Sequence, residues 1–166
     1  VEILGGSYLN NAVIKDHVTI DSSKIQDSSV DEYTTIGPMS HLRNNTHVGK
    51  HCRIGNFVEF KNTNFGDGSK CAHLTYVGDS DVGKNVNFGC GVVTVNYDGK
   101  NKFRTTIKDG AFIGSNVNLI APVTIGENAL LAAGSTITDD VEDGDMGIAR
   151  NRQSNKEGYG TQYKNK

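Results

Sequence analysis

The chain has 166 residues, enough for one domain or one solenoid, and its net charge of −2 gives no electrostatic case for nucleic-acid binding. Its 20 glycines, 2 prolines and lack of tryptophan argue against a helical bundle and against a disordered proline-rich linker. No apolar run reaches the roughly 18 residues of a membrane helix, and no signal peptide is visible.

The three cysteines, Cys52, Cys71 and Cys90, bear on the compartment. They are odd in number and lack a C-x-x-C spacing, so they suggest neither a disulfide framework nor a zinc site. We therefore expect a cytosolic (cytoplasmic) protein without membrane insertion. Because the chain opens on Val1 rather than on methionine, we expect it to be a processed or excised fragment.

A bulky apolar residue recurs every five or six positions along most of the chain, which is the mark of a repeat architecture. The spacing begins, with several slips, at Ile3, Leu9, Ile14, Ile20, Ile25 and Val30. It continues at Ile36, Leu42, Val48, Ile54, Phe60, Phe65, Cys71, Val77, Val82 and Phe88. It returns without a slip at Ile107, Ile113, Leu119, Ile125, Leu131 and Ile137.

A second series of small or β-branched residues lies four positions after these bulky residues. Its members are Ser40, Thr46, Cys52, Val58, Ser69, Thr75, Val86, Val92, Ala111, Val117, Val123, Ala129 and Ser135. The position just before it is rich in glycine and asparagine, at Asn45, Gly68, Asn85, Gly91, Gly110, Asn116, Asn128 and Gly134. These two residue types tolerate the positive φ of a tight corner, so the pattern predicts flat faces joined by corners.

Three such faces close a triangular coil, and stacked coils pair as parallel strands about 4.8 Å apart. We therefore predict an all-β fold, a left-handed parallel β-helix built from hexapeptide repeats. The 22 bulky positions, shared among three faces, predict about seven coils and a prism roughly 35 Å long. The alternative, a β-sandwich, would alternate with period two between turns about 8–12 residues apart, whereas the period here stays at six from Ile107 to Ile137.

Two segments interrupt the repeat. Residues 94–106 lack the apolar spacing and contain the turn signal N-Y-D-G, so they are predicted to project as one loop, and such insertions often build a binding site. From Val141 the repeat stops, and glycines break any long helix. We therefore divide the chain into a β-helix domain, residues 1–140, and an irregular C-terminal tail, residues 141–166.

Several short stretches resemble one family: GPMSHLR at 37–43, GNFVEFKN at 55–62, KCAHLTYVGDSDVG at 70–83, NVNFGCG at 85–91, NYDGKNKFRT at 96–105 and APVTIG at 121–126. They are similar to the C-terminal acetyltransferase domain of the bacterial bifunctional enzyme that acts as glucosamine-1-phosphate N-acetyltransferase and N-acetylglucosamine-1-phosphate uridyltransferase. With the repeat, the resemblance runs from about Ile14 to Gly158. The motifs HLTY and NYDGxNK are more specific than the hexapeptide pattern, which many acyltransferases share.

The resemblance implies transfer of an acetyl group from acetyl-CoA to the 2-amino group of glucosamine 1-phosphate. The product would feed the synthesis of UDP-N-acetylglucosamine and the cell wall. The family's nucleotidyltransferase domain begins with a glycine-rich L-A-A-G-x-G-T-x-M loop, which is absent here: Leu-Ala-Ala-Gly at 131–134 is followed by Ser-Thr-Ile and falls on the repeat. Uridyltransferase activity is therefore not expected from this chain.

His73 is the predicted catalytic residue. Acetyl transfer from a thioester to an amine requires a base that removes the amine proton, and a neutral histidine suits this task near neutral pH. His73 lies two residues after the inward Cys71, so its side chain should point out of the prism. If His73 is considered without its sequence context, a surface histidine with no functional role is the alternative interpretation. The resemblance at HLTY implies instead that His73 is the proton acceptor.

The resemblance also implies a sugar-phosphate site. Arg43 can donate two hydrogen bonds to a phosphate, and Lys61 can attract the phosphate as a point charge. Each follows an inward residue by one position, so the two should emerge from equivalent corners. Taken alone they would be ordinary solvated cations; the resemblance assigns both to the substrate, together with Tyr76, Asn87 and Lys102.

The residues that the resemblance assigns to acetyl-CoA are Cys90, Asn96, Tyr97, Ser115, Ala133 and Arg150. Asn96 could polarise the thioester carbonyl or orient the amine. Ala133 and Cys90 would line a groove with their backbone groups, and Arg150 would meet a coenzyme phosphate. Cys90 departs from the alanine of the family pattern, and a covalent role for it is weak because direct transfer needs no protein nucleophile.

His41, His47 and His51 form a second candidate cluster. His41 and His47 are six residues apart and are expected to stack on successive coils, with His51 four residues further on. Such a set could bind a metal, but neither an ordered triad nor acidic supporting residues are evident. We predict no metal in this domain and leave a metal on these three histidines open.

Two other functions are compatible with the repeat: a hexapeptide acyltransferase with another sugar or amine acceptor, and a non-catalytic solenoid scaffold. A scaffold would need neither the cations Arg43 and Lys61 nor a 94–106 loop facing His73.

A flat-sided prism also offers little concavity for a ligand as long as coenzyme A, whereas a closed cyclic assembly creates clefts between prisms. The resemblance implies a homotrimer of parallel prisms with active sites at its interfaces and the tail reaching a neighbour.

Overall fold

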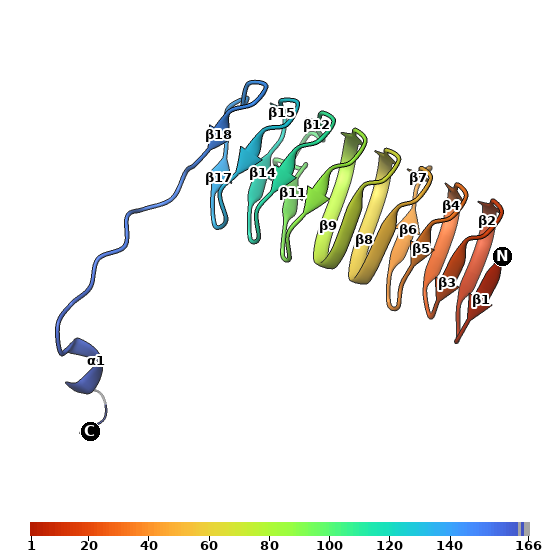
Figure 1. Ribbon diagram of the computed structural model, residues 1–166, viewed down its shortest axis with the longest axis horizontal. Helices are drawn as coiled ribbons and strands as arrows, with labels where there is room; N and C mark the ends of the chain where they lie inside the picture. The colour runs from red at the N-terminus through yellow and green to blue at the C-terminus, as the bar shows by residue number, and fades with distance from the viewer. Residues whose placement is uncertain (163, 165–166) are drawn as a thin grey trace.

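Three ladders of parallel strands form the sides of a triangular prism and confirm the predicted left-handed parallel β-helix (Figure 1). The computed structural model describes residues 1–162 and residue 164. The coils follow one another along the prism axis in sequence order, and the C-terminal tail extends away from the last coil (Figure 1).

The three faces are defined by the register of their strands. The first face stacks β1 (Glu2–Leu4), β3 (Thr19–Asp21), β5 (Thr35–Ile36), the first parts of β8 (Arg53–Phe65) and β9 (Lys70–Val82), β10 (Asn87–Phe88), β13 (Phe112–Ile113), β16 (Leu130–Leu131) and β18 (Met146–Gly147). The second face stacks the first parts of β2 (Tyr8–Ile14) and β4 (Lys24–Val30), then β6 (His41–Arg43), the middle of β8 and β9, β11 (Val93–Val95), β14 (Asn118–Ile120) and β17 (Thr136–Ile137). The third face stacks the ends of β2 and β4, then β7 (His47–Val48), the ends of β8 and β9, β12 (Thr105–Ile107) and β15 (Val123–Ile125). We call the edge between the first and second faces the first corner, the next edge the second corner, and the edge between the third and first faces the third corner.

The bulky positions of the repeat point inward and form the core. From Ile20 to Ile137 all of them are buried, and they stack at the same place in successive coils. Every member of the second, small series is buried as well. The glycine and asparagine positions before that series all have positive φ, between 54° and 76°. The predicted division into inward faces and left-handed corners is therefore confirmed.

The prism is longer than predicted. Among the described residues the first face holds nine strands, so the prediction of about seven coils was too low. Thr94 and Gly147 occupy inward register positions, so a polar residue and a glycine take places where a bulky residue was expected. Val141 forms a bridge to Ile125 and extends the third face past the point at which the repeat was expected to stop.

The projecting loop is shorter than the predicted segment 94–106. Thr94 lies within β11 and Thr105 begins β12, so the loop itself comprises residues 96–104. Its two arms are joined by an antiparallel bridge between Tyr97 and Lys102, and Phe103 N–H donates to the Asn96 carbonyl at 2.9 Å. The insertion is therefore a small closed hairpin rather than an extended loop.

Beyond β18 the chain leaves the prism as the irregular tail, which carries one short helix, α1 (Tyr159–Gln162) (Figure 1). Within the described part of the chain, no helix has both the length and the apolar character needed to cross a membrane.

Candidate active site

Four of the predicted site residues form a row along the first corner. His73, Cys90, Ser115 and Ala133 each lie two positions after an inward residue of the first face, on consecutive coils. Backbone hydrogen bonds connect successive members of this row. The N–H groups of Gly91, Asn116 and Gly134 donate to the carbonyl oxygens of His73, Cys90 and Ser115, at 3.3 Å, 2.8 Å and 2.8 Å. Arg150 extends this first-corner row, because its Nη1 donates to the Ala133 carbonyl at 2.6 Å.

His73 is exposed at the first corner, as predicted. Its carbonyl oxygen accepts a hydrogen bond from Thr75 Oγ1 at 2.7 Å, which fixes the backbone at this turn. Its imidazole has no hydrogen-bond partner among the described residues, so both ring nitrogens are open to a ligand or a neighbouring chain. The next residue, Leu74, has φ of 45° and turns the chain onto the second face.

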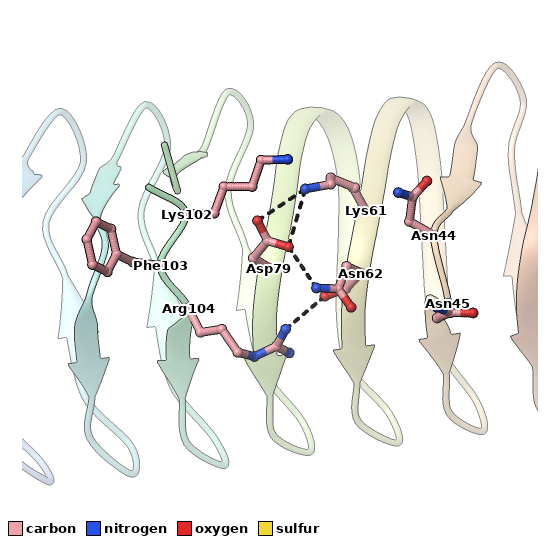
Figure 2. A pocket seen from close by; sticks show the side chains of 8 residues that line it. All are labelled: Asn44, Asn45, Lys61, Asn62, Asp79, Lys102, Phe103 and Arg104. Carbon is pink, nitrogen blue, oxygen red and sulfur yellow. Dashed lines mark hydrogen bonds and ion pairs between the residues drawn. The ribbon is translucent and has the colours of Figure 1, made fainter. Parts of the chain in front are cut away.

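A buried ion pair marks the second corner. Lys61 Nζ lies 3.2 Å from Asp79 Oδ2 and 3.4 Å from Oδ1, and the two residues are only 9% and 5% exposed (Figure 2). Burying two charges is costly unless each has a partner and further hydrogen bonds. Asn62 and Asn96 supply these bonds, since their amide nitrogens donate to Asp79 at 2.8 Å and 2.6 Å.

The environment of Asp79 favours its ionised form. Burial alone would raise the pKa of its carboxyl group, but the hydrogen bonds from Asn62, Asn96 and Lys61, together with the Lys61 charge, outweigh burial and hold that pKa below its ordinary value. Asp79 is therefore an anion that accepts hydrogen bonds and donates none.

Tyr76 joins the same network from the second face. Asn96 Nδ2 lies 3.3 Å from the Tyr76 hydroxyl, which also lies against Gly78. A Cβ added at Gly78 would come within 2.3 Å of the Tyr76 hydroxyl and 2.8 Å of Asn96 Nδ2. Glycine at position 78 therefore leaves the space in which these two side chains meet.

Arg43 and Lys61 are paired in register on the second face, so the prediction that they emerge at equivalent positions of successive coils is confirmed. Arg43 Nε donates to Glu59 Oε1 at 2.7 Å, and both side chains are partly exposed. Such an exposed ion pair is weak and leaves the remaining guanidinium nitrogens available.

A pocket of about 490 Å³ opens at the second corner beneath the 96–104 loop (Figure 2). The residues that line it are Asn44, Asn45, Lys61, Asn62, Asp79, Lys102, Phe103 and Arg104. In Figure 2 the side chains of Lys61 and Lys102 extend toward each other across the pocket. Lys102 is exposed and has no ion-pair partner among the described residues, so its charge is available to an anion.

Arg104 fastens the returning arm of the loop to the prism. Its Nε and Nη2 donate to the Asp81 carboxylate at 3.0 Å and 2.8 Å, and Nη2 also donates to the Ser80 carbonyl at 3.0 Å. The hydrogen bond from Arg104 lowers the pKa of Asp81 against the opposing effect of burial, and Asp81 in turn raises the pKa of Arg104. This clamp sets the position of Lys102, two residues earlier.

One chain does not bring all the predicted residues together. The first-corner row and the second-corner pocket lie on opposite edges of the second face, so the 96–104 loop does not face His73 within one prism. Asn87 projects from the first face, paired with Lys70 and Phe112, and is separate from the pocket. Tyr97 is exposed on the loop, where its hydroxyl donates to the Gly99 carbonyl.

The other histidines do not converge. His41 lies on the second face and His47 on the third, because six residues advance the chain by one face rather than one coil; the expectation that they stack on successive coils was wrong. His41 Nε2 contacts Gln26 at 3.2 Å, and His47 lies 3.3 Å from Asp31. His51 stacks on Tyr33 at the third corner. In the described chain, no three histidine, cysteine or carboxylate side chains are grouped as metal ligands.

Sequence reasoning missed Asp79 and Arg104. Asp79 lies at a corner with φ of 48°, a position at which the repeat favours glycine or asparagine. An aspartate at such a position was the feature of the sequence that could have identified it. Arg104 lies inside the insertion, and nothing in its spacing indicated that it would reach Asp81.

Comparisons with known proteins support the repeat architecture. Residues 104–139 match the family model of the bacterial transferase hexapeptide (six repeats). The bifunctional protein GlmU of an Exiguobacterium species is 54% identical over 153 residues, covering 92% of this chain and 34% of that protein. The same protein of Shouchella clausii is 57% identical over 157 residues, covering 95% of this chain and 35% of that protein. The chain thus spans about a third of the length of the curated relatives it matches.

Two solved structures share the fold at low identity. The polySia-specific acetyltransferase NeuO is 17% identical with a TM-score of 0.59, over 94% of this chain and 84% of that one. The UDP-N-acetylglucosamine acyltransferase of Campylobacter jejuni is 13% identical with a TM-score of 0.56, over 88% of this chain and 71% of that one. At these identities the likeness establishes the β-helix architecture alone.

Proposed function

The chain belongs to the family of the bifunctional protein GlmU, and we propose that it transfers the acetyl group of acetyl-CoA to the 2-amino group of glucosamine 1-phosphate. The product, N-acetylglucosamine 1-phosphate, would serve the synthesis of UDP-N-acetylglucosamine and the cell wall.

The observation that carries the proposal is the composition of the second-corner pocket. A phosphorylated amino sugar needs cations for its phosphate and hydrogen-bonding groups for its ring. Lys61 and Lys102 line the pocket, and Arg43 lies one coil from Lys61. Asn62 and Asn96 place amide groups beside these cations. Arginine and lysine are the residues that bind phosphate most strongly in proteins.

His73 is proposed as the general base. The free amine of the acceptor attacks the thioester carbonyl carbon, and His73 takes one proton from the nitrogen as the C–N bond forms. Collapse of the tetrahedral intermediate then breaks the C–S bond, and the protonated His73 returns the proton to the leaving thiolate. Because His73 is exposed and its imidazole has no hydrogen-bond partner in the part of the chain that the structure describes, it is free to accept that proton.

The first-corner row is proposed as the track for the coenzyme. Cys90, Ser115 and Ala133 have small side chains on consecutive coils, so a long thin ligand can lie along them parallel to the prism axis. Arg150 at the far end of the row would meet a phosphate of the coenzyme. Tyr97 belongs to the same proposal, as a coenzyme contact contributed by the loop, whereas Asn87 is proposed to contact the sugar-phosphate substrate from the first face.

The active species is proposed to be a homotrimer of parallel prisms. The row and the pocket lie on opposite edges of one face, so a neighbouring prism is needed to bring a His73 to a pocket. Met39, Phe57 and Leu74 support such contacts, since each is 57–60% exposed and has positive φ between 45° and 60°. Bulky apolar residues are disfavoured both by that backbone conformation and by exposure, which favours a covered surface.

A cytosolic location completes the proposal. The three cysteines are free thiols, which is the usual state in a reducing compartment.

The direct test is release of the coenzyme thiol from acetyl-CoA in the presence of single amino sugars. Glucosamine 1-phosphate should support the fastest release, and glucosamine a much slower one. A preferred acceptor of another kind, such as a nucleotide-linked amino sugar, would instead identify a different hexapeptide acyltransferase. No release with any acceptor, from protein shown to be folded and trimeric, would favour a scaffold.

A further inference from the structure

Asp79 links three consecutive coils through its side chain. Its carboxylate accepts from Lys61 and Asn62 on β8 (Figure 2). It also accepts from Asn96, which directly follows β11. Five per cent of the residue is exposed, so the carboxylate reaches solvent or substrate poorly. Its role is therefore exerted through the groups that it holds.

The carboxylate dictates how the two amides are oriented. An ionised carboxylate can only accept hydrogen bonds, so each amide must turn its NH2 group toward Asp79. At 2.6 Å from Asp79 Oδ2, an amide oxygen of Asn96 would face another oxygen without a proton between them. The side-chain amide oxygen of Asn96, Oδ1, is thereby directed away from Asp79, and it has no hydrogen-bond partner within the described chain.

The donors of Asn96 are also fully used. One N–H bond of Nδ2 serves Asp79 and the other the Tyr76 hydroxyl. Two roles were expected for Asn96. Polarising a carbonyl would need a free N–H donor, whereas orienting an amine needs an acceptor oxygen. Because both N–H bonds are used, only the role of acceptor is open to the Asn96 amide.

We propose that Asp79 is a positioning residue for acetyl transfer: it orients Asn96 so that the amide oxygen receives an N–H of the acceptor amine, and it holds the Lys61 ammonium at the phosphate. The inference rests on the proposed function. In this proposal the buried Asp79 carboxylate positions both groups that bind the acceptor: Asn96 at its amine and Lys61 at its phosphate.

The first variant is Asp79→Asn. Asparagine has the same shape and tolerates the positive φ of this corner, so the backbone is retained. Without the anion, Asn96 can rotate its amide, and small misplacements of a reacting group can lower rates by about 100-fold. We expect kcat to fall by about 10–100-fold and KM for acetyl-CoA to change by less than about 3-fold. Asp67→Asn, which removes an acidic partner of Lys84 at the third corner, is the matched control and should leave both constants unchanged.

A second pair of variants avoids the buried charge and keeps the test informative if Asp79→Asn folds poorly. Asn62→Gly suits the φ of 50° at that corner and removes only the amide that donates to Asp79. Asn62 and Asn96 share no hydrogen bond, and both contact Asp79. Their effects on kcat, measured as Asn62→Gly, Asn96→Ala and the double variant, should therefore be non-additive. Additive effects would overturn the proposal.

A crystal structure of Asp79→Asn tests the positioning without turnover. A displaced Lys61 ammonium and a rotated Asn96 amide support the inference, and unchanged positions of both overturn it, as does a kcat within about 3-fold of the wild-type value. A wild-type protein that fails to acetylate glucosamine 1-phosphate would defeat the proposed function, and the structure of the variant would still decide whether Asp79 positions these two groups.

Discussion

Arg43 and Lys61 lie one coil apart at the same position of the second face, yet their partners differ in kind. Arg43 pairs with the partly exposed Glu59, whereas Lys61 pairs with the buried Asp79. The two cations can therefore be separated by experiment, because both should serve the substrate phosphate and only Lys61 should also support the fold.

Replacing Arg43 or Lys61 with alanine should impair acetylation of glucosamine 1-phosphate by about 10–100-fold in kcat/KM, the cost of one charged hydrogen bond. Unphosphorylated glucosamine should lose much less. Lys61→Ala should in addition lower the melting temperature, since it leaves the Asp79 carboxylate buried without a cation, and Arg43→Ala should not. Steady-state kinetics on both acceptors and thermal melts check this, and equal losses on the two acceptors would show that neither residue recognises the phosphate.

His73→Ala should lower the acetylation rate by about 100–10,000-fold, the usual contribution of a positioned general base. The melting temperature should be unchanged, because the imidazole is exposed and makes no hydrogen bond within the described chain. His51→Ala, at the third corner, is the matched control and should retain full activity. A His73→Ala protein with near-wild-type turnover at neutral pH would remove His73 from the mechanism.

Acid should destabilise the fold through Asp79. The pKa of this carboxyl group is lower in the folded state than its ordinary value of 3.8, so the unfolded chain takes up the proton first as the pH falls. The stabilisation is complete above the ordinary value and is lost as the pH falls through the folded-state pKa. Urea unfolding between about pH 6 and about pH 3 should show a steeper loss of unfolding free energy for wild type than for Asp79→Asn. Parallel curves would contradict the assignment.

Cys90 should be the thiol that reacts in the native protein. Burial raises the pKa of Cys52 to about 11 and that of Cys71 to about 12, so both remain protonated and inaccessible, whereas Cys90 is half-buried on the first-corner row. Iodoacetamide followed by mass spectrometry should label Cys90 in the native state and all three cysteines after denaturation.

The same labelling tests the coenzyme track. Acetyl-CoA should slow alkylation of Cys90 if the coenzyme lies along the row, and glucosamine 1-phosphate alone should protect it less. An alkylation rate that saturating acetyl-CoA leaves unchanged would place the coenzyme elsewhere.

Sedimentation should give a mass near three times 17.9 kDa for the wild-type chain. Phe57→Asp or Leu74→Asp should shift it toward the monomer and abolish activity, because a charge at the first corner cannot be buried against a neighbour. Tyr33→Asp is the control and should remain trimeric, because this residue lies at the third corner and its ring stacks on His17 and His51 of the same chain. A fully active monomer would defeat the proposal that the site is shared between chains.

The period of the sequence determined the architecture. A bulky residue every five or six positions, a small residue four later and a glycine or asparagine between them specify an inward face and a left-handed corner. These are local requirements of each hexapeptide, so they can be read without knowing what it packs against. The outward direction of His73 followed from the same rule, because it depends only on its distance from Cys71. The inward position of Thr94 could not be predicted by this rule, because Thr94 is polar and is buried through its stacking between two coils.

The contacts of the site required the tertiary structure. Which residue of one coil meets which residue of the next depends on every five- or six-residue step in between, and one slip changes the partner. Asp79 meets Lys61, Asn62 and Asn96 only because the coils between them contain 17 or 18 residues. The protonation of Asp79 and the orientation of the Asn96 amide follow from those distances in a site shielded from water. A one-dimensional period contains no information about them, since charge and hydrogen bonding depend on separations in space.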